Sequence, residues 1–396
     1  MRAPAGVLGD PDLGEDLVLA DRRLEEVDEE VVGLDGPGAP GAGDHELRPE
    51  GQRGRTQVAR GVSRLQPAGD PAPFEVLEGP AEESERLVSA YTGLVPAAPI
   101  PVAEAVGRDE WAEANLRSMK GVLDPVSDRL GDGLGPLSGI VGTGLGVLLA
   151  AEAGALSGFL AGRVLGQYEF PVLDPEAPAR LLFVAPNLGH AASQLEAEPD
   201  QLLRWVALHE STHALQFGAV PWLRGHLAAC VRELLGGMTF EGGSLLKIPD
   251  LADLKGLADR VREDGIATLA LGPERRELFD GMQALMAVLE GYAEHVMDAV
   301  GGDVLDDLPA LRGALNRRRR ERSGFLRLFE RLIGMDLKLR QYEQGKAFCD
   351  AVVAQAGIEG LNRVWISPEA MPTVAELSDP LGWLARTEQL RLRPSA

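Results

Sequence analysis

The stretch LHESTHALQF, residues 208–217, places His209 and His213 four positions apart. Apolar residues recur around this pair at the spacing of a helix, with Asp200 as a candidate N-cap and Gly218 as a candidate stop. The pattern therefore predicts a helix from about Asp200 to Gly218. Residues four apart stand on one face of such a helix, so the two imidazoles are expected to point the same way.

Glu210, directly after the first histidine, completes the pattern HExxH. Two imidazoles on one helix face can take two corners of a tetrahedral zinc site, about 2.0–2.1 Å from the ion. The glutamate beside them can take a proton from a water molecule whose pKa zinc lowers to about 7. The pattern is therefore typical of metal-dependent hydrolysis, with Zn²⁺ as the expected cofactor and Glu210 as the expected general base. The structural alternative is an ordinary helix with two hydrogen-bonded histidines.

A catalytic zinc site also needs a third protein ligand and an open fourth position. A third histidine six residues after His213 is absent, because Ala219 stands there. The stretch ALMAVLEGYAEHVMDAV, residues 284–300, predicts a second helix in which Glu290 and Glu294 interrupt an apolar run. A buried carboxylate is costly unless it is paired or bound to a cation, so this helix is the leading source of the third ligand.

Between these two carboxylates we favour Glu290 as the ligand. The residues after it include the small Gly291 and Ala293, which would let the glutamate helix approach the HExxH helix closely. Glu294 is then either a partner that orients a ligand histidine or a solvated residue towards the end of the helix. Glu241, in a glycine-flanked loop, is a rival for the third position.

The composition is typical of a globular protein with an acidic surplus: 45% of the 396 residues are hydrophobic and the net charge is −22. This surplus argues against nucleic acid and anionic membrane surfaces, because no excess of cations is present to displace counterions from phosphates. Cys230 and Cys349 lie far apart, which excludes a disulfide framework, and the N-terminus shows no secretory signal. The expected location is therefore the cytoplasm.

The first 75 residues differ from the rest of the chain. They contain 12 glycines, 8 prolines, 16 acidic residues and 8 arginines, and their apolar periodicity is weak. Such a segment does not bury enough apolar surface to offset the entropy of ordering it. The sequence therefore predicts that residues 1–75 are low-complexity and mostly disordered, or lie upstream of the true translation start. Residues 76–396 are predicted to form a mainly helical domain.

Most of that domain has helical periodicity. Besides the HExxH helix, helices are expected over residues 222–235, 251–263, 274–300, 309–334 and 336–357. The best strand candidate is ARLLFVAPN, residues 179–187, a short apolar run that ends at a proline and an asparagine. The predicted fold class is therefore mainly α, with at most a small β element.

Residues 134–151 carry no charged side chain. A membrane span needs about 20 apolar residues, and the proline and glycines within this stretch favour closely packed buried helices instead. No stable membrane insertion is expected, and a membrane-associated protein is a weaker, third hypothesis.

Several motifs combine in this chain: HESTHALQF with PWLR, LEGYAEHVMD, LKLRQYEQGKAF, and GLNRVW followed by PLGWLAR. Together they resemble the zincin-like metallopeptidase family of high-GC bacteria, one branch of which is associated with the biosynthesis of a deazaflavin coenzyme. The resemblance covers about residues 80–390, and the first 75 residues have no counterpart in it.

The resemblance implies a zincin-like multi-helix domain in which the HExxH helix packs against a glutamate-bearing helix. It implies that His209, His213 and Glu290 hold zinc and that Glu210 is the general base. One departure is the interval between His213 and Glu290, which is longer than in the compact glutamate zincins.

The leading hypothesis is a zinc-dependent hydrolase, and within that class a metallopeptidase that acts on a peptide or another amide substrate. The alternative is a non-catalytic, zinc-stabilised scaffold or binding protein that retains a vestigial HExxH site. The two hypotheses differ at the fourth coordination position, which is open in a hydrolase and closed in a structural site.

Overall fold

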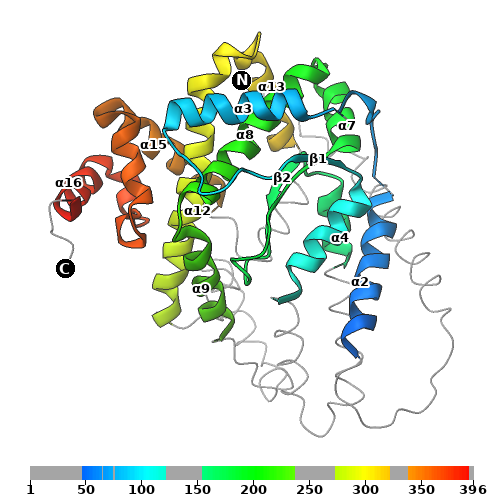
Figure 1. Ribbon diagram of the computed structural model, residues 1–396, viewed down its shortest axis with the longest axis horizontal. Coiled ribbons are helices and arrows are strands. Elements are labelled where there is room, and N and C mark those ends of the chain that lie inside the picture. Colours follow the sequence, from blue (N-terminus) through cyan, green and yellow to red (C-terminus); the bar gives the residue numbers. More distant parts are fainter. Residues whose placement is uncertain are drawn as a thin grey trace, which may run out of the picture.

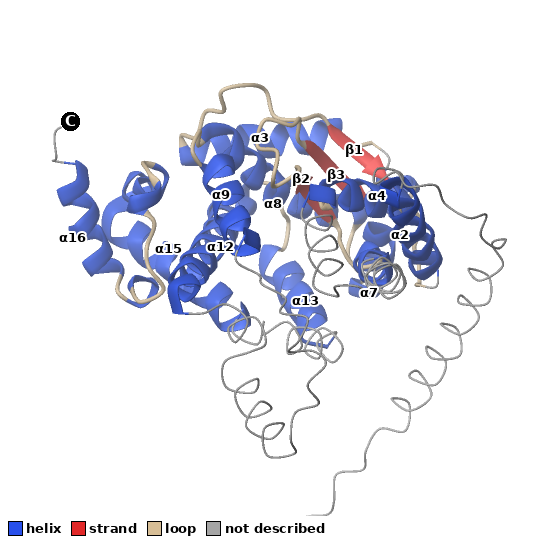
Figure 2. Cartoon of the chain, turned by 90° about the horizontal axis from the view of Figure 1, so that it is seen from below, coloured by secondary structure: helices blue, strands red, loops and turns tan. Residues whose placement is uncertain are grey.

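The structure is a computed structural model that describes residues 47–64, 66–74, 76–121, 154–236, 273–321 and 338–391. Helices make up most of these residues, and three short strands form one small sheet (Figures 1 and 2). The prediction of a mainly α fold with a small β element is therefore confirmed.

The sheet has the strand order β1-β3-β2. β1 (Ala103–Val106) runs parallel to the central strand β3 (Arg180–Val184), and β2 (Gly166–Glu169) runs antiparallel to it. β3 lies within the stretch 179–187, so the strand prediction is confirmed. Its side chains alternate between two cores, because Leu181 and Phe183 belong to the main hydrophobic cluster, whereas Leu182 and Val184 belong to a smaller one.

The HExxH stretch lies in α8 (Pro199–Ala219), so the predicted helix is confirmed, with its ends shifted by one residue. Pro199 occupies the first turn, where its fixed φ suits a helix start, and Asp200 therefore lies inside the helix and pairs with Arg204. Gly218 also lies inside the helix. A Cβ at Gly218 would lie 3.0 Å from Pro96 Cβ, and the Gly218 carbonyl accepts a hydrogen bond from Ala97 N–H, so this glycine allows a close contact with residues 96–97.

Four further helices share the main hydrophobic core with α8: α3 (Glu78–Thr92), α9 (Leu223–Gly236), α12 (Pro273–Val300) and α15 (Lys338–Leu361). Of these, α3 and α12 pack directly on α8. α12 is central, since it packs against α3, α8, α9 and α15 (Figure 1). α9, α12 and α15 agree with the predicted ranges 222–235, 274–300 and 336–357. The predicted helix 251–263 lies outside the described residues.

Five further α-helices complete the described part of the chain. α2 (Leu47–Arg64) and α4 (Arg108–Ser118) pack together at one end, α7 (Ala185–Leu195) follows β3 directly, and α16 (Pro380–Arg391) packs on α15 at the other end (Figure 1). α13 (Leu308–Glu321) covers the first half of the predicted range 309–334; the second half lies outside the described residues.

Residues 47–74 differ from the prediction of a mostly disordered N-terminal segment. They contain α2 and the short helix η1 (Ala72–Phe74), and Ala59 and Phe74 are buried. The buried Arg108 guanidinium donates hydrogen bonds to backbone carbonyls of this segment. A search for apolar periodicity in the sequence does not reveal such polar contacts. The domain boundary after residue 75 stays a prediction, and residues 1–46 lie outside the described part of the chain.

The uncharged stretch 134–151 also lies outside the described residues. Within the described part of the chain, no helix is both long enough and apolar enough to cross a membrane. Cys230 and Cys349 are free and buried.

Candidate metal centre

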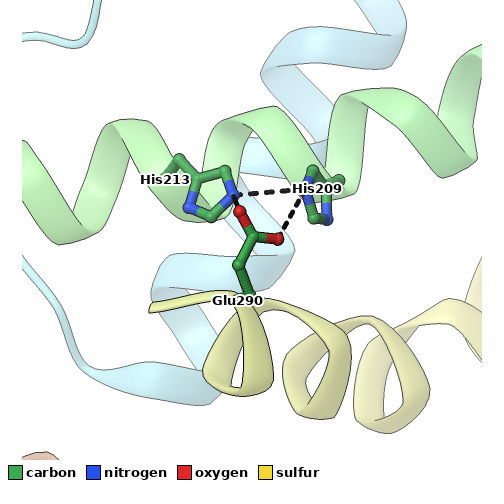
Figure 3. Close-up of side chains that lie close together, drawn as sticks. All are labelled: His209, His213 and Glu290. Atoms are coloured by element: carbon green, nitrogen blue, oxygen red, sulfur yellow. Dashed lines mark hydrogen bonds and ion pairs between the residues drawn. The ribbon is translucent and has the colours of Figure 1, made fainter. Parts of the chain in front are cut away.

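Three side chains from two helices converge between α8 and α12 (Figure 3). The Nε2 atoms of His209 and His213 lie 3.1 Å apart. One Glu290 carboxylate oxygen lies 3.7 Å from His209 Nε2, and the other lies 3.8 Å from His213 Nε2. Among the described residues, this is the one group of histidine, cysteine and carboxylate side chains close enough to share a cation. The structure thus brings together the three residues that the sequence suggested as ligands.

The other candidate ligand on α12, Glu294, is not a member of this group. It pairs with Arg312 of α13 at 3.3 Å. The neighbouring His295 is not solvated either, because its Nδ1 lies 2.7 Å from Asp350 and its Nε2 lies 2.8 Å from the Tyr91 hydroxyl. Both residues thus join polar contacts between helices, and the Glu294 pair is with Arg312, which matches neither of the two alternatives, a partner of a ligand histidine or a solvated residue.

The small residue after Glu290 serves a different contact from the one expected. A Cβ at Gly291 would overlap the backbone of Gly345, so the close approach that Gly291 permits is to α15 and not to α8. The expectation that Gly291 opens α12 to the HExxH helix is therefore wrong. The rival ligand Glu241 lies outside the described residues.

Gln216 connects the two helices of the site. Its Oε1 lies 2.9 Å from His213 Nδ1, and its Nε2 donates a hydrogen bond to the backbone carbonyl of Leu289 at 3.1 Å. The Gln216 side chain is fully buried. The His209 imidazole is bordered by an aromatic ring, since Trp205 lies parallel to it with the ring centroids 6.3 Å apart.

Glu210 lies on the side of α8 that faces β2. The backbone N–H of Tyr168 donates a hydrogen bond to Glu210 Oε2 at 3.0 Å. The absence of a side chain at Gly166 permits this approach, because a Cβ there would lie 2.7 Å from Glu210 Cγ. Burial raises the pKa of the Glu210 carboxyl to about 7, and the nearby His213 and the Tyr168 N–H oppose this rise. A divalent cation beside Glu210 would favour its ionised form.

A cluster of aromatic side chains packs β2, and Phe170 directly after it, against α8. The Tyr168 ring stacks on Phe217 with centroids 5.7 Å apart, and Phe170 meets Phe217 at 4.9 Å. The Arg224 guanidinium lies over Phe170, 4.6 Å from its centroid. Because these contacts hold the Tyr168 backbone in place, they also keep its N–H directed at Glu210.

Sequence reasoning missed Gln216, Tyr168 and Gly166. Gln216 lies three residues after His213, and residues at that spacing are neighbours on a helix, so the sequence carried a usable signal for it. Nothing comparable marks Gly166 or Tyr168, because they reach the site only through the pairing of β2 with β3 and the packing of both against α8.

The family model of zincin-like metallopeptidases matches residues 52–384, which is most of the chain. The chain belongs to this family. The match begins earlier than the resemblance inferred from the sequence motifs and includes most of α2. A zincin-like metallopeptidase is thereby confirmed at the level of the family, whereas the origin in high-GC bacteria and the association with a deazaflavin coenzyme stay predictions.

This zincin-like chain is also similar to a solved structure. A crystal structure from Chloroflexus aurantiacus, described as a proposed hydrolase with a novel fold, is 32% identical and superimposes with a TM-score of 0.64. The similarity covers 85% of the present chain and 98% of the other. The search of curated proteins found no match.

Proposed function

We propose that this protein is a zinc-dependent hydrolase, and within that class a peptidase or amidase in which His209, His213 and Glu290 bind Zn²⁺. The observation that carries the proposal is the convergence of two imidazole nitrogens and one carboxylate from α8 and α12. Membership of the zincin-like metallopeptidase family and the likeness to a proposed hydrolase support the same reaction class.

The three donor groups fit zinc in both kind and spacing. Ligand atoms at about 2.1 Å from the centre of a tetrahedron lie about 3.4 Å from one another. The separations of 3.1, 3.7 and 3.8 Å among the Nε2 atoms and the Glu290 oxygens bracket that value. Two histidines and one glutamate are also a ligand set of catalytic zinc enzymes.

Zinc bound here would polarise a scissile carbonyl and lower the pKa of a water molecule. Glu210 then acts as the general base and takes a proton from the attacking water. Tyr168 N–H holds one of its carboxylate oxygens, and no described residue donates a hydrogen bond to the other, which is left to accept that proton. The same carboxyl passes the proton to the leaving nitrogen. A bound cation would favour the ionised Glu210 carboxylate, which is the form that can accept a proton.

The exposure of Glu290 favours a hydrolase over a non-catalytic scaffold. Its side chain is 28% exposed, whereas those of His209 and His213 are 15% and 13% exposed. The site is therefore reachable from solvent on the Glu290 side. A structural zinc site is closed by four protein ligands, whereas the described residues bring three together here.

The test compares wild-type protein with Glu210→Gln. Both are loaded with Zn²⁺ and incubated with labelled casein and with a defined mixture of unstructured peptides, and the products are identified by mass spectrometry. We expect cleavage by the wild type and a loss of at least about 100-fold in the variant, since general-base catalysis contributes about 10²–10⁴-fold. Both proteins should retain one zinc per chain.

Two results would contradict the proposal. Cleavage by Glu210→Gln at the wild-type rate would remove Glu210 from the mechanism. Full zinc occupancy without cleavage of any peptide would favour the scaffold alternative. The cytoplasmic location and the link to coenzyme biosynthesis stay predictions.

A further inference from the structure

We propose that Gln216 is a positioning residue that acts on both helices of the cation site. Its side-chain amide fixes the ring tautomer of His213 on α8 and holds the α12 backbone next to Glu290. The inference rests on the proposed metal site. Its experiment also has a readout that does not depend on metal or on activity.

The first effect concerns which ring nitrogen of His213 is free to bind a cation. A backbone carbonyl only accepts hydrogen bonds, so the Gln216 group that faces the Leu289 carbonyl must be the NH₂, at 3.1 Å. The Gln216 oxygen then faces His213 Nδ1 at 2.9 Å, and an amide oxygen also only accepts. His213 Nδ1 must therefore carry the proton, and Nε2 keeps its lone pair. Nε2 is the atom that faces His209 and Glu290.

The second effect concerns the distance between the helices. Leu289 directly precedes Glu290, so a hydrogen bond to its carbonyl fixes the α12 backbone where the third ligand leaves it. Gln216 is the residue on α8 that makes this contact, one turn after His213. The position of Glu290 relative to the imidazoles thus depends on the same side chain that sets the His213 tautomer.

Burial makes both contacts hard to replace. Gln216 has no exposed surface, so water cannot substitute for either hydrogen bond in the folded chain. Partners of this kind around metal-binding histidines affect metal affinity by about 10–100-fold. A side chain with only a structural role would change the stability of the fold and leave the affinity of the folded protein for zinc unaltered.

The first experiment uses Gln216→Met, which keeps the length of the side chain and removes both hydrogen bonds. Thr212→Val is the matched control. Thr212 is also buried on α8, next to His213, but its hydroxyl donates only to the Leu208 carbonyl of the same helix. Full-length proteins are stripped with a chelator, their folding is checked by circular dichroism, and zinc affinity is measured by competition with a chromogenic chelator.

We expect Gln216→Met to bind zinc about 10–100-fold more weakly than wild type. Thr212→Val should stay within about twofold of the wild-type affinity even where its melting temperature falls, because its hydrogen bond touches neither ligand. A folded Gln216→Met variant with wild-type affinity would overturn the inference, and so would an equal loss in Thr212→Val.

The second measurement needs no variant at Gln216 and therefore no assumption that such a variant folds. Cation-free wild-type protein with ¹⁵N-labelled histidine is examined by NMR at a pH where the rings are neutral, and His213 is assigned by comparison with His213→Gln. We expect a protonated Nδ1 and an unprotonated Nε2. The opposite tautomer would overturn the inference. Protein with the expected tautomer that binds no zinc would instead contradict the proposed function and leave the role of Gln216 in orienting the ring intact.

Discussion

At the scale of single residues, the orientation of Glu210 depends on a residue that has no side chain. The Glu210 carboxylate accepts a hydrogen bond from Tyr168 N–H because β2 runs directly against α8 at Gly166. A Cβ at Gly166 would lie 2.7 Å from Glu210 Cγ and 2.8 Å from Val206 Cγ1. Separations below 3.0 Å force one of the partners to move.

The substitution Gly166→Ala should therefore displace Glu210 while the three proposed ligands stay in place. We expect peptide cleavage to fall by about 100-fold, the loss typical of a misplacement of about 1 Å, with zinc content unchanged. The measurement is kcat together with metal content. The control is Gly225→Ala on α9, where a Cβ would meet nothing within 4 Å. Wild-type kcat in Gly166→Ala would show that the fit between β2 and Glu210 does not matter for catalysis.

At the scale of helices and strands, local sequence patterns predicted the elements but not the tertiary contacts between them. α8 and α12 follow from apolar spacing, and β3 follows from a short apolar run, because in each case the residues that mark the element are adjacent in the chain. The HExxH pair could be found in the same way. The spacing of Gln216 from His213 carried a signal for that contact. The contacts of Gln216 with Leu289 and of Tyr168 with Glu210 could not be predicted, because the partners lie far apart in sequence.

The pairing of α12 with α15 depends on another contact that sequence reasoning assigned wrongly. Gly291 of α12 lies against Gly345 of α15, and Gly345 in turn lies against the backbone carbonyl of Ala287. Neither position has room for a Cβ, so the two helix backbones touch. This contact lies directly beside Glu290 and keeps its helix in place.

The substitution Gly291→Ala should separate α12 from α15 and destabilise the fold by about 2 kcal/mol or more, because overpacking against a backbone is not relieved by a change of rotamer. The control is Gly281→Ala on the exposed side of the same helix, where a Cβ would meet nothing within 4 Å. There, alanine should be neutral or stabilise by up to about 1 kcal/mol. Urea unfolding measures both, and equal stabilities would contradict the packing described.

At the scale of the whole molecule, one buried arginine side chain joins the N-terminal segment to the sheet end of the domain. Arg108 at the start of α4 donates hydrogen bonds to Asn187 at 2.6 Å and to the backbone carbonyls of Ser63, Gln66 and Pro67. These contacts link α2, the chain after it, α4 and α7. No pattern of apolar residues could have revealed them, which is why residues 47–74 were expected to be disordered.

The substitution Arg108→Met should remove the guanidinium donor from these four acceptors, of which the Ser63 carbonyl keeps a long hydrogen bond from Gln66 N–H. Each buried acceptor that loses its partner costs about 1–3 kcal/mol, so we expect a loss of about 3 kcal/mol or more in the free energy of unfolding. The control is Arg64→Met, which removes an exposed pair with Asp109 and should cost less than about 1 kcal/mol. Equal effects in the two variants would show that residues 47–74 do not fold with the rest of the domain.

The central claim concerns the whole site: two imidazoles of α8 and the Glu290 carboxylate of α12 hold one zinc ion. Calorimetric titration of Zn²⁺ into the chelator-stripped full chain tests it most directly, with Glu290→Ala compared against Glu294→Ala, one turn along the same helix. We predict one site per chain, an affinity at least about 100-fold weaker (about 3 kcal/mol) in Glu290→Ala, and near-wild-type affinity in Glu294→Ala. The absence of saturable binding, or equal affinities in the two variants, would contradict the account.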